Sequence, residues 1–406
     1  MDILLDDQEE QVLQAVRDFL QQECTISTVR NAEKSPSRIS ELLWAEFCDL
    51  GWLGLCLPES VGGQGLPVTY LGLLLEEHGR YMAPLPTYST LVAATVLAKY
   101  GSNQQTVSLL PEVVRGSHIL TFAITEKEGV WGRDSIGLQA LRRGPEFELT
   151  GEKYFVGHAR SANQCLVAAR ICEEGRESSH VSLILVDMKA AGVSIHALSP
   201  MAKDDESVIR FDRVRISEEC VIGSLSDSNA FDDLLDVAAV LLACQMGGAA
   251  RRATEMAVEY VKERDAFGQP IAAFQAIQHM AADMLNGVDG TQLLSREALW
   301  RMSEGLPASV EASQAKAFAN VHCVMACRSS QQMHGGIGFI AEFDLNLWYR
   351  RVISWSLRAG TTREHRARVA SAILRKDGPA RLGMPMYLPQ EQEALVLKNP
   401  QLEIVN

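Results

Sequence analysis

The sequence predicts an α+β protein with an N-terminal helical domain, a middle antiparallel β-domain and a C-terminal helical bundle. Three observations lead to this prediction. Apolar residues recur at helical spacing over residues 1–118, short β-rich runs follow over 119–225, and long helical patterns return over 226–377. Glycines and charged turns, rather than helices, separate the short runs, which favours an antiparallel sheet or small barrel over βαβ units.

The composition is that of an ordinary globular protein of 406 residues, of which 47% are hydrophobic and 22% are charged. The formal net charge of -13 argues against nucleic-acid binding, which usually requires a basic face. Met1 leads into an acidic amphipathic segment without the parts of a signal peptide, and no apolar run approaches the length of a membrane span. We therefore expect a cytosolic protein without membrane contact.

The N-terminal domain opens with a predicted amphipathic helix, in which Asp7 and Glu10 form a capping pair. Four further helical patterns follow. A glycine-rich turn at 62–65 and the prolines Pro84 and Pro86 interrupt them, as expected between separate helices. These predicted helices span 39–50, 70–81, 87–100 and 105–115.

The middle domain contains five predicted strands, and the C-terminal domain contains three long predicted helices. Long helices joined by short turns are typical of a helix bundle. Residues 378–406 contain four prolines and no sustained period, so we expect an extended tail there. The predicted strands span 119–125, 147–156, 164–171, 181–186 and 208–216, and the predicted helices span 231–264, 274–303 and 307–333.

Nine cysteines are present without the spacing of a metal site. Cys323 and Cys327 lie one helical turn apart in an apolar stretch, and a metal pair would need two more ligands. Small buried thiols in a reducing compartment are the simpler interpretation, and we expect no metal.

The segment 263–271 joins two of the long helices and has two interpretations. Gly268 and Pro270 are typical of a helix-turn-helix corner, which is the interpretation that spacing alone favours. The alternative is a phosphate contact, because Arg264 offers a fork of donors suited to a pyrophosphate and Phe267 offers a flat face beside it.

A second segment, 332–338, follows the third long helix and contains Gly335, Gly336 and Gly338. These glycines form a C-cap turn in one interpretation. In the other, they let backbone amides approach an anionic ligand where a Cβ atom would intrude.

Together, the two segments resemble the acyl-CoA dehydrogenase family, which carries Arg-x-x-Phe-Gly-x-Pro and then Gln-x-x-Gly-Gly-x-Gly at this separation. The likeness includes residues 50–66 and 123–126 and covers about residues 1–375. It implies a C-terminal four-helix bundle, FAD as cofactor, and two segments that reach across to the FAD of a neighbouring subunit. The implied cofactor-binding residues are Arg264, Phe267, Gln275, Gln332, Gly335 and Gly336.

The resemblance also implies an absent catalytic base. The family removes an α-proton and a β-hydride from an acyl-CoA thioester, and a glutamate takes the proton. In the turn that carries this glutamate, Ala359 stands at its position. Other members place the base on the preceding long helix, where this chain has Ala238, followed by Ala239 at the usual CoA-contacting arginine. A methyl group cannot accept a proton, so no catalytic residue is expected.

Four other side chains are candidates for catalytic groups. Asp236 or Glu364 would replace the base only if the local register or loop path differs from that of the family. His158 and His365 have no acidic partner at a fixed spacing, so a surface or structural role is favoured for both.

The losses extend to the side of the site that would face the flavin ring. The family's Trp-x-Thr/Ser strand is replaced by Phe155, Val156 and Gly157, and its proline-containing loop by residues 127–132. The resemblance therefore implies a chain that keeps the adenine and pyrophosphate side of a flavin site and loses the ring side.

Three functional hypotheses follow from this pattern. The first is a base-less subunit of a heteromeric acyl-CoA dehydrogenase, whose partner subunit carries the catalytic glutamate and which passes electrons to an electron-transfer flavoprotein. Members acting on steroid or other ring-bearing side chains include such heterotetramers, and residues 361–366 with Arg368 resemble their less catalytic subunits. The alternatives are a homo-oligomeric FAD enzyme with an unusual base acting on a CoA thioester, and a non-enzymatic scaffold that keeps the fold.

Overall fold

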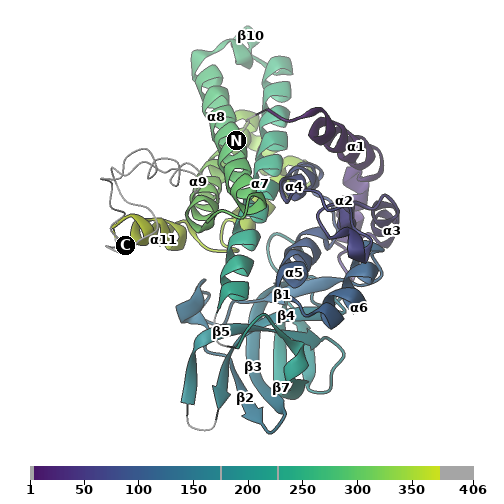
Figure 1. Ribbon diagram of the computed structural model, residues 1–406. Coiled ribbons are helices and arrows are strands. Elements are labelled where there is room, and N and C mark those ends of the chain that lie inside the picture. Colours follow the sequence, from purple (N-terminus) through teal and green to yellow (C-terminus); the bar gives the residue numbers. More distant parts are fainter. Residues whose placement is uncertain (1–3, 174–175, 226–227, 375–406) are drawn as a thin grey trace, which may run out of the picture.

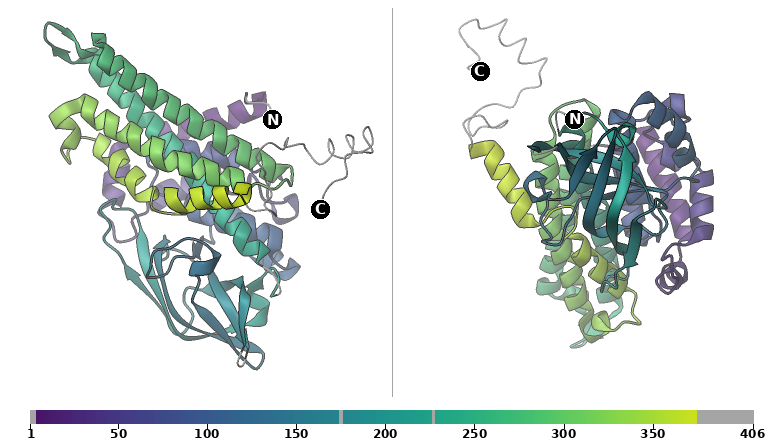
Figure 2. Two further views of the ribbon diagram at one scale, coloured as in Figure 1. Left: turned by 90° about the vertical axis from the view of Figure 1, so that its left-hand side faces the viewer. Right: turned by 90° about the horizontal axis from the view of Figure 1, so that it is seen from below.

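The computed structural model describes residues 4–173, 176–225 and 228–374, and it has the predicted order of domains (Figure 1). A helical N-terminal domain, a β-sheet domain and a helical C-terminal domain follow one another along the chain. Seen from below, the β-domain lies in front, with the N-terminal helices on one side and the C-terminal helices on the other (Figure 2). The predicted tail at 378–406 lies outside the described residues.

The N-terminal domain contains six α-helices. The first begins one residue earlier than predicted: Asp6 is the N-cap, its carboxylate accepts from the Glu9 backbone N–H at 2.7 Å, and the Glu9 side chain bonds back to it. The predicted Asp7 and Glu10 pair is therefore wrong by one position. The helices are α1 (Asp7–Glu23), α2 (Ile26–Ala32), α3 (Glu41–Asp49), α4 (Thr69–Tyr81), α5 (Thr87–Tyr100) and α6 (Asn103–Val114).

The β-domain forms one sheet with the strand order β6-β7-β3-β2-β4-β5-β8, and β1 pairs with β4. Most pairs are antiparallel as predicted, but β4 is parallel to both β1 and β2, so the sheet is mixed. The short strands β2, β6 and β8 were not predicted. The strands are β1 (Leu120–Ala123), β2 (Gln139–Arg143), β3 (Glu146–Gly157), β4 (Gln164–Glu173), β5 (Arg176–Asp187), β6 (Val193–Ala197), β7 (Glu206–Ser217) and β8 (Val221–Ile222).

The C-terminal domain packs three long helices, α7 (Asn229–Glu263), α8 (Gln275–Ser303) and α9 (Ser309–His334), with two shorter ones, α10 (Leu345–Trp355) and α11 (Thr362–Leu374). The two shorter helices were not predicted separately. Within the described residues, α7 is long and apolar enough to cross a membrane, which corrects the sequence expectation, but 94% of its apolar window is buried inside the protein. It is the central core helix of the bundle.

Helices α4 and α7 approach each other closely enough that glycine is required at the contact. A methyl group at Gly248 would lie 1.7 Å from the Glu76 carbonyl oxygen, and one at Gly79 would lie 1.9 Å from the carbonyl oxygen of Gln245. Real Cβ atoms do not come this close to a backbone oxygen. The contact fixes the N-terminal domain on α7 and brings His78 and Gln245 to the same region.

Candidate functional site

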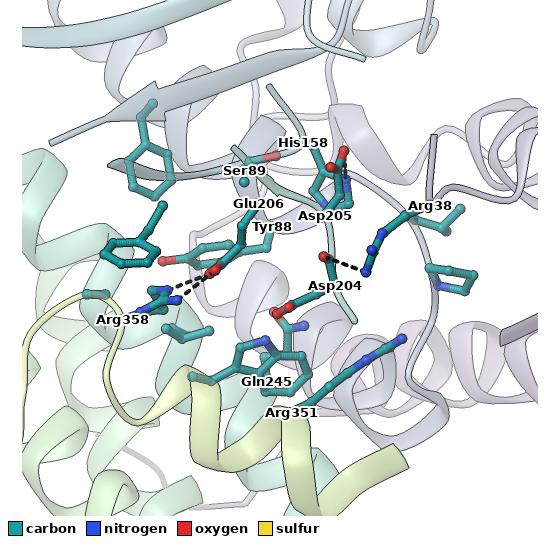
Figure 3. Close-up of a pocket in the computed structure, with 18 of the residues that line it drawn as sticks. Arg38, Tyr88, Ser89, His158, Asp204, Asp205, Glu206, Gln245, Arg351 and Arg358 are labelled. Atoms are coloured by element: carbon teal, nitrogen blue, oxygen red, sulfur yellow. Dashed lines mark hydrogen bonds and ion pairs between the residues drawn. The ribbon is translucent and has the colours of Figure 1, made fainter. Parts of the chain in front are cut away.

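A cavity of about 130 Å³ lies where the three domains meet (Figure 3). Its walls come from α4, the start of α5, strands β1 and β3, the loop before β7, the middle of α7, and α10 with the loop that follows it. Several residues singled out in the sequence gather here: Trp131, Phe155, Gly157, His158 and Ala359. Residues expected to face a flavin ring and the position expected for the base therefore share one cavity.

Arg358 forms one wall of the cavity. Its Nε and Nη2 atoms bond to the two carboxylate oxygens of Glu206 at 2.5 and 2.6 Å, and its guanidinium carbon lies 4.1 Å from the ring centre of Phe155. Burial raises the pKa of Glu206, and the hydrogen bond from Arg358 opposes that rise. The same three residues also line a neighbouring groove of about 580 Å³, so this ion pair separates the groove from the cavity.

The turn that carries Ala359 is held by buried polar groups below it. The Ala359 carbonyl oxygen lies 2.8 Å from Nε2 of His365, and Asn320 donates to the Gly360 carbonyl at 3.1 Å. Lys316, which is fully buried, bonds to Asn320 and donates to the Trp355 carbonyl at 3.1 Å. His365 therefore has a structural role, and the turn presents a methyl group, not a carboxylate, to the cavity.

Neither residue considered as a replacement base lines the cavity. Asp236 accepts hydrogen bonds from Ser309 and Arg368, each at 2.5 Å. Glu364 accepts from the backbone N–H groups of Thr361 and Trp131, each at 2.7 Å, so it caps α11 and ties the loop before β2 to the bundle. Neither the register of α7 nor the path of the loop before α11 brings one of these carboxylates to the cavity.

Sequence reasoning missed the acidic groups that do line the cavity. Asp204 and Asp205 enter it from the loop before β7, and Glu206 enters it from the first position of that strand. Nδ1 of His158 lies 3.8 Å from Oδ2 of Asp205, so this histidine does have an acidic neighbour, from a segment distant in sequence. The available signal was the charged run 203–206 directly before a strand, where a solvated turn is the usual interpretation.

The segment 263–271 lies at the opposite end of α7, as a short hairpin that points away from the β-domain (Figure 1). Arg264 is the exposed C-cap of α7, and Gln275 is exposed at the start of α8. Phe267 sits at the hairpin turn with a positive φ of 56° and is 93% exposed. Its ring meets Phe274 edge-on, with centroids 6.0 Å apart.

The glycine segment 332–338 follows α9 and lies beside the hairpin end of α7. The rings of Tyr260, in the last turn of α7, and His334, at the end of α9, stack with centroids 4.5 Å apart. Gln332 and Gly336 are exposed and Gly335 is half-buried. Among the described residues, no atom lies within 4 Å of the space where a Cβ of either glycine would be, so an external group has access to the backbone.

The predicted cofactor-binding residues are thus brought together with one another but not with the cavity. From Gln245, in the cavity wall, to Arg264 there are 19 residues of continuous helix, which at a rise of 1.5 Å per residue is about 28 Å. No single small group spans the cavity and this exposed bundle end. Within one chain they are two separate surfaces.

No three His, Cys, Asp or Glu side chains in the described part of the chain are grouped so as to hold a metal ion. All nine cysteines are free thiols, seven of them buried.

Comparison with known proteins identifies the fold. The chain matches three successive domain models of the acyl-CoA dehydrogenases: the N-terminal domain over residues 6–117, the middle domain over 121–214 and the C-terminal domain over 229–374. Subunit CarC of the caffeyl-CoA reductase-Etf complex of Acetobacterium woodii is 29% identical over 91% of this chain and 99% of its own. The probable acyl-CoA dehydrogenase YngJ of Bacillus subtilis is 27% identical over 92% of this chain and 100% of its own.

Solved structures show the same relationship. A variant of the Tcur3481-Tcur3483 steroid acyl-CoA dehydrogenase is 31% identical, with a TM-score of 0.83 over 90% of this chain and 97% of that one. A chain of the ChsE4-ChsE5 complex from Mycobacterium tuberculosis, at 24% identity, shares the fold with a TM-score of 0.84 over 91% and 98% of the two chains. FAD is the cofactor of the acyl-CoA dehydrogenase family. From its three matching domains and its fold, this chain belongs to the acyl-CoA dehydrogenase family.

Proposed function

We propose that this chain is the base-less subunit of a heteromeric acyl-CoA dehydrogenase and completes the FAD site of a partner subunit. One observation carries the proposal. The residues suited to a dinucleotide lie on an exposed bundle end about 28 Å along α7 from the chain's own cavity, so they serve a neighbour. The partner subunit supplies the catalytic glutamate that Ala359 replaces here.

The exposed bundle end fits the phosphate and adenine side of FAD. Arg264 offers a planar fork of donors for a pyrophosphate, and Phe267 offers an exposed aromatic face. The open backbone at Gly335 and Gly336 lets peptide groups approach a ligand directly. When bound, FAD supplies the hydride acceptor, and this chain's residues hold and orient it from the far side of the interface.

The chain's own cavity does not fit a flavin ring. Arg358, paired with Glu206, lies against Phe155 in the region where the ring would face the β-domain. Trp131 comes from the loop that replaces the family's proline-containing loop, and its backbone is tied to Glu364. No catalytic step is assigned to this cavity.

The substrate and the electron acceptor follow from relatives. A structural relative at 31% identity is named as a steroid acyl-CoA dehydrogenase, which favours a thioester with a bulky ring-bearing side chain. The relative CarC is a subunit of a complex that includes an Etf, which favours an electron-transfer flavoprotein as acceptor. The complex catalyses the α,β-dehydrogenation of this thioester in the cytoplasm.

The test is to purify the chain alone and after co-expression with a dehydrogenase encoded beside it, and to measure flavin absorbance, mass and acyl-CoA oxidation. The proposal expects a colourless, inactive lone chain and an active complex with fewer flavins than chains. Arg264→Ala should lower the flavin content of the complex, because one charge-assisted contact is worth about 1.5–3 kcal/mol, or roughly 10- to 100-fold in affinity. The matched control is Arg215→Ala, an exposed arginine of β7.

A lone chain that binds one FAD and oxidises a thioester would contradict the proposal and support the homo-oligomeric enzyme. In that event Glu206, not Asp236 or Glu364, is the residue to replace, because it is a carboxylate inside the cavity whose pKa burial raises. A complex that contains no flavin would support a scaffold.

A further inference from the structure

The cavity between the three domains contains buried polar atoms that the protein itself does not satisfy. They include both ring nitrogens of His78, Oε1 of Gln245, Nε of Arg351 and Oδ2 of Asp205, none of which has a hydrogen-bond partner in the described parts of the chain. These four residues are between 3% and 5% exposed. The lining residues Trp131, His158 and Asp204 each add one such atom. An unpaired buried polar atom destabilises the folded state, and native proteins contain few of them, so their concentration in one cavity requires a cause.

The unpaired groups converge from separate elements. His78 lies on α4, Gln245 on α7 and Arg351 on α10, while Asp205 comes from the loop before β7. In Figure 3, Gln245 and Arg351 lie on one side of the space, and Asp205 with His158 lies on the opposite side. Groups from three domains that point into one space form a built site, in contrast to a single surface patch.

The electrostatics of the cavity favour a neutral occupant. Its lining has four carboxylates and four cations: Glu33, Asp204, Asp205 and Glu206 against Arg38, Lys203, Arg351 and Arg358. Burial, with smaller contributions from His158 and Arg351, lowers the pKa of His78 to about 3 against an opposing interaction with the Leu85 backbone, so this imidazole is uncharged. An anion or cation would gain no net attraction here and would lose its hydration.

The unpaired atoms include both donors and acceptors. Nε of Arg351 and the single N–H of neutral His78 donate, whereas the other His78 nitrogen, Gln245 Oε1 and Asp205 Oδ2 accept. A hydroxyl group both donates and accepts, so two or more hydroxyl groups satisfy this set. A hydrocarbon chain would leave every one of these atoms unpaired, which makes the cavity unsuited to an aliphatic acyl group.

The size of the cavity limits the ligand. Its volume of about 130 Å³ is slightly below that of an engineered cavity in another protein, about 150 Å³, which holds one benzene molecule. Leu85, Phe122 and Ile124 form an apolar part of the wall that suits a carbon skeleton. We propose that this cavity binds a compact, neutral molecule carrying two or more hydroxyl groups, such as a small polyol or a ring diol.

The site is independent of the partner-subunit role, because it uses neither the exposed bundle end nor FAD. The probes are glycerol and cis-cyclohexane-1,2-diol, titrated into the full-length chain in a buffer without polyols and followed by calorimetry and by ligand-observed NMR. Binding is expected at about 10 µM to 1 mM, within what ligands of this size reach. Propionate and cyclohexanol are expected to bind at least about 10-fold more weakly, because they lack the matching hydroxyl pair.

Two variants test the named residues. His78→Phe and Gln245→Met should each weaken diol binding about 3- to 10-fold, as expected for a lost neutral hydrogen bond. Neither should lower the thermal midpoint, because each removes polar atoms that have no partner within the protein. Gln14→Met, on the exposed face of α1, is the matched control and should change neither quantity.

Three results would overturn the proposal. The first is that no diol binds the wild-type chain with a Kd below about 10 mM, which corresponds to a binding free energy of about -2.7 kcal/mol. This result would indicate that the cavity holds only water. The second is equal binding of propionate, which indicates an anion site. The third is unchanged diol binding in both variants, which places the diol elsewhere. The selectivity of the wild-type chain is measured without any variant, so it stands even if a variant fails to fold.

Discussion

Arg358 shows how one side chain shapes the cavity. Its pairing with Glu206 closes one side of the cavity, and the two side chains are only 23% and 7% exposed. Removing one partner of such a buried ion pair destabilises the folded protein, because the remaining charge has neither water nor a partner. Arg358, directly before Ala359, thus forms a fixed wall on one side of the cavity.

Arg358→Ala should therefore reduce the free energy of unfolding by about 3 kcal/mol at pH 8. Burial would then raise the pKa of Glu206 without opposition. A raised folded-state pKa favours the native state at low pH, and this stability is lost as the pH rises through the folded-state value. The difference in free energy of unfolding between Arg358→Ala and the wild type should accordingly be smaller at pH 5 than at pH 8. Chemical denaturation at both pH values measures this difference. Adding Glu206→Gln to Arg358→Ala should recover most of the lost stability. An equal loss of stability at pH 5 and pH 8 would contradict the electrostatic cause.

Lys316 provides a second prediction at the same scale. Burial lowers its pKa to about 7 from an ordinary 10.5, so the unfolded chain binds this proton more tightly than the native chain. Between these two values the contribution of Lys316 to stability rises with pH, by up to about 1.4 kcal/mol per pH unit. Lys316→Met should flatten this rise, as chemical denaturation between pH 7 and 10 would show. Lys262→Met, at the exposed end of α7, is the control and should leave the rise of stability with pH unchanged. If the rise persists in Lys316→Met, another group causes it.

At the scale of elements, the contact of α4 with α7 determines where the cavity lies. Its closest point is where Gly248 meets the Glu76 carbonyl, within one turn of Gln245 on α7 and of His78 on α4. Moving these helices apart would separate His78 from Gln245. The packing of one glycine therefore controls the geometry of a site to which it contributes no side chain.

Gly248→Ala should destabilise the protein by about 3 kcal/mol or more, because rigid backbone on both helices must move to admit the methyl group. Gly336→Ala is the matched control, since the space beside this glycine is open in the described structure. It should leave the thermal midpoint of the lone chain unchanged. Similar midpoints for the two variants, measured by calorimetry, would show that the helix contact is not as tight as the structure indicates.

For the whole molecule, the main feature is the separation of two functional surfaces by the length of α7. The exposed bundle end carries Arg264, Phe267 and the glycine segment, and the cavity lies among all three domains. The proposed role places the contact with a neighbour at one end of α7 and leaves a separate, polar cavity at the other. The flavin content of the complex and diol binding by the lone chain therefore report on different surfaces.

Much of the architecture could be predicted from periodicity. The helix over Thr87–Tyr100 was predicted with its exact bounds, and the long helices α7, α8 and α9 within about two residues, because apolar periodicity persists over many turns. Strands β2, β6 and β8 were missed because each has five residues or fewer and little alternation. The parallel pairing of β4 was missed because pairing partners depend on contacts between distant segments.

The sequence by itself determined the order of the domains and the two motif segments, and it led to the prediction that Ala359 stands at the base position, since these depend on local pattern and residue identity. Tertiary structure alone decided which residues share a site. It brought Asp205 to His158, closed the cavity with Arg358 and Glu206, and placed Asp236 and Glu364 in contacts outside it. The physical reason is that burial and electrostatic pairing arise between segments far apart in the chain, and no local pattern records which segments will meet.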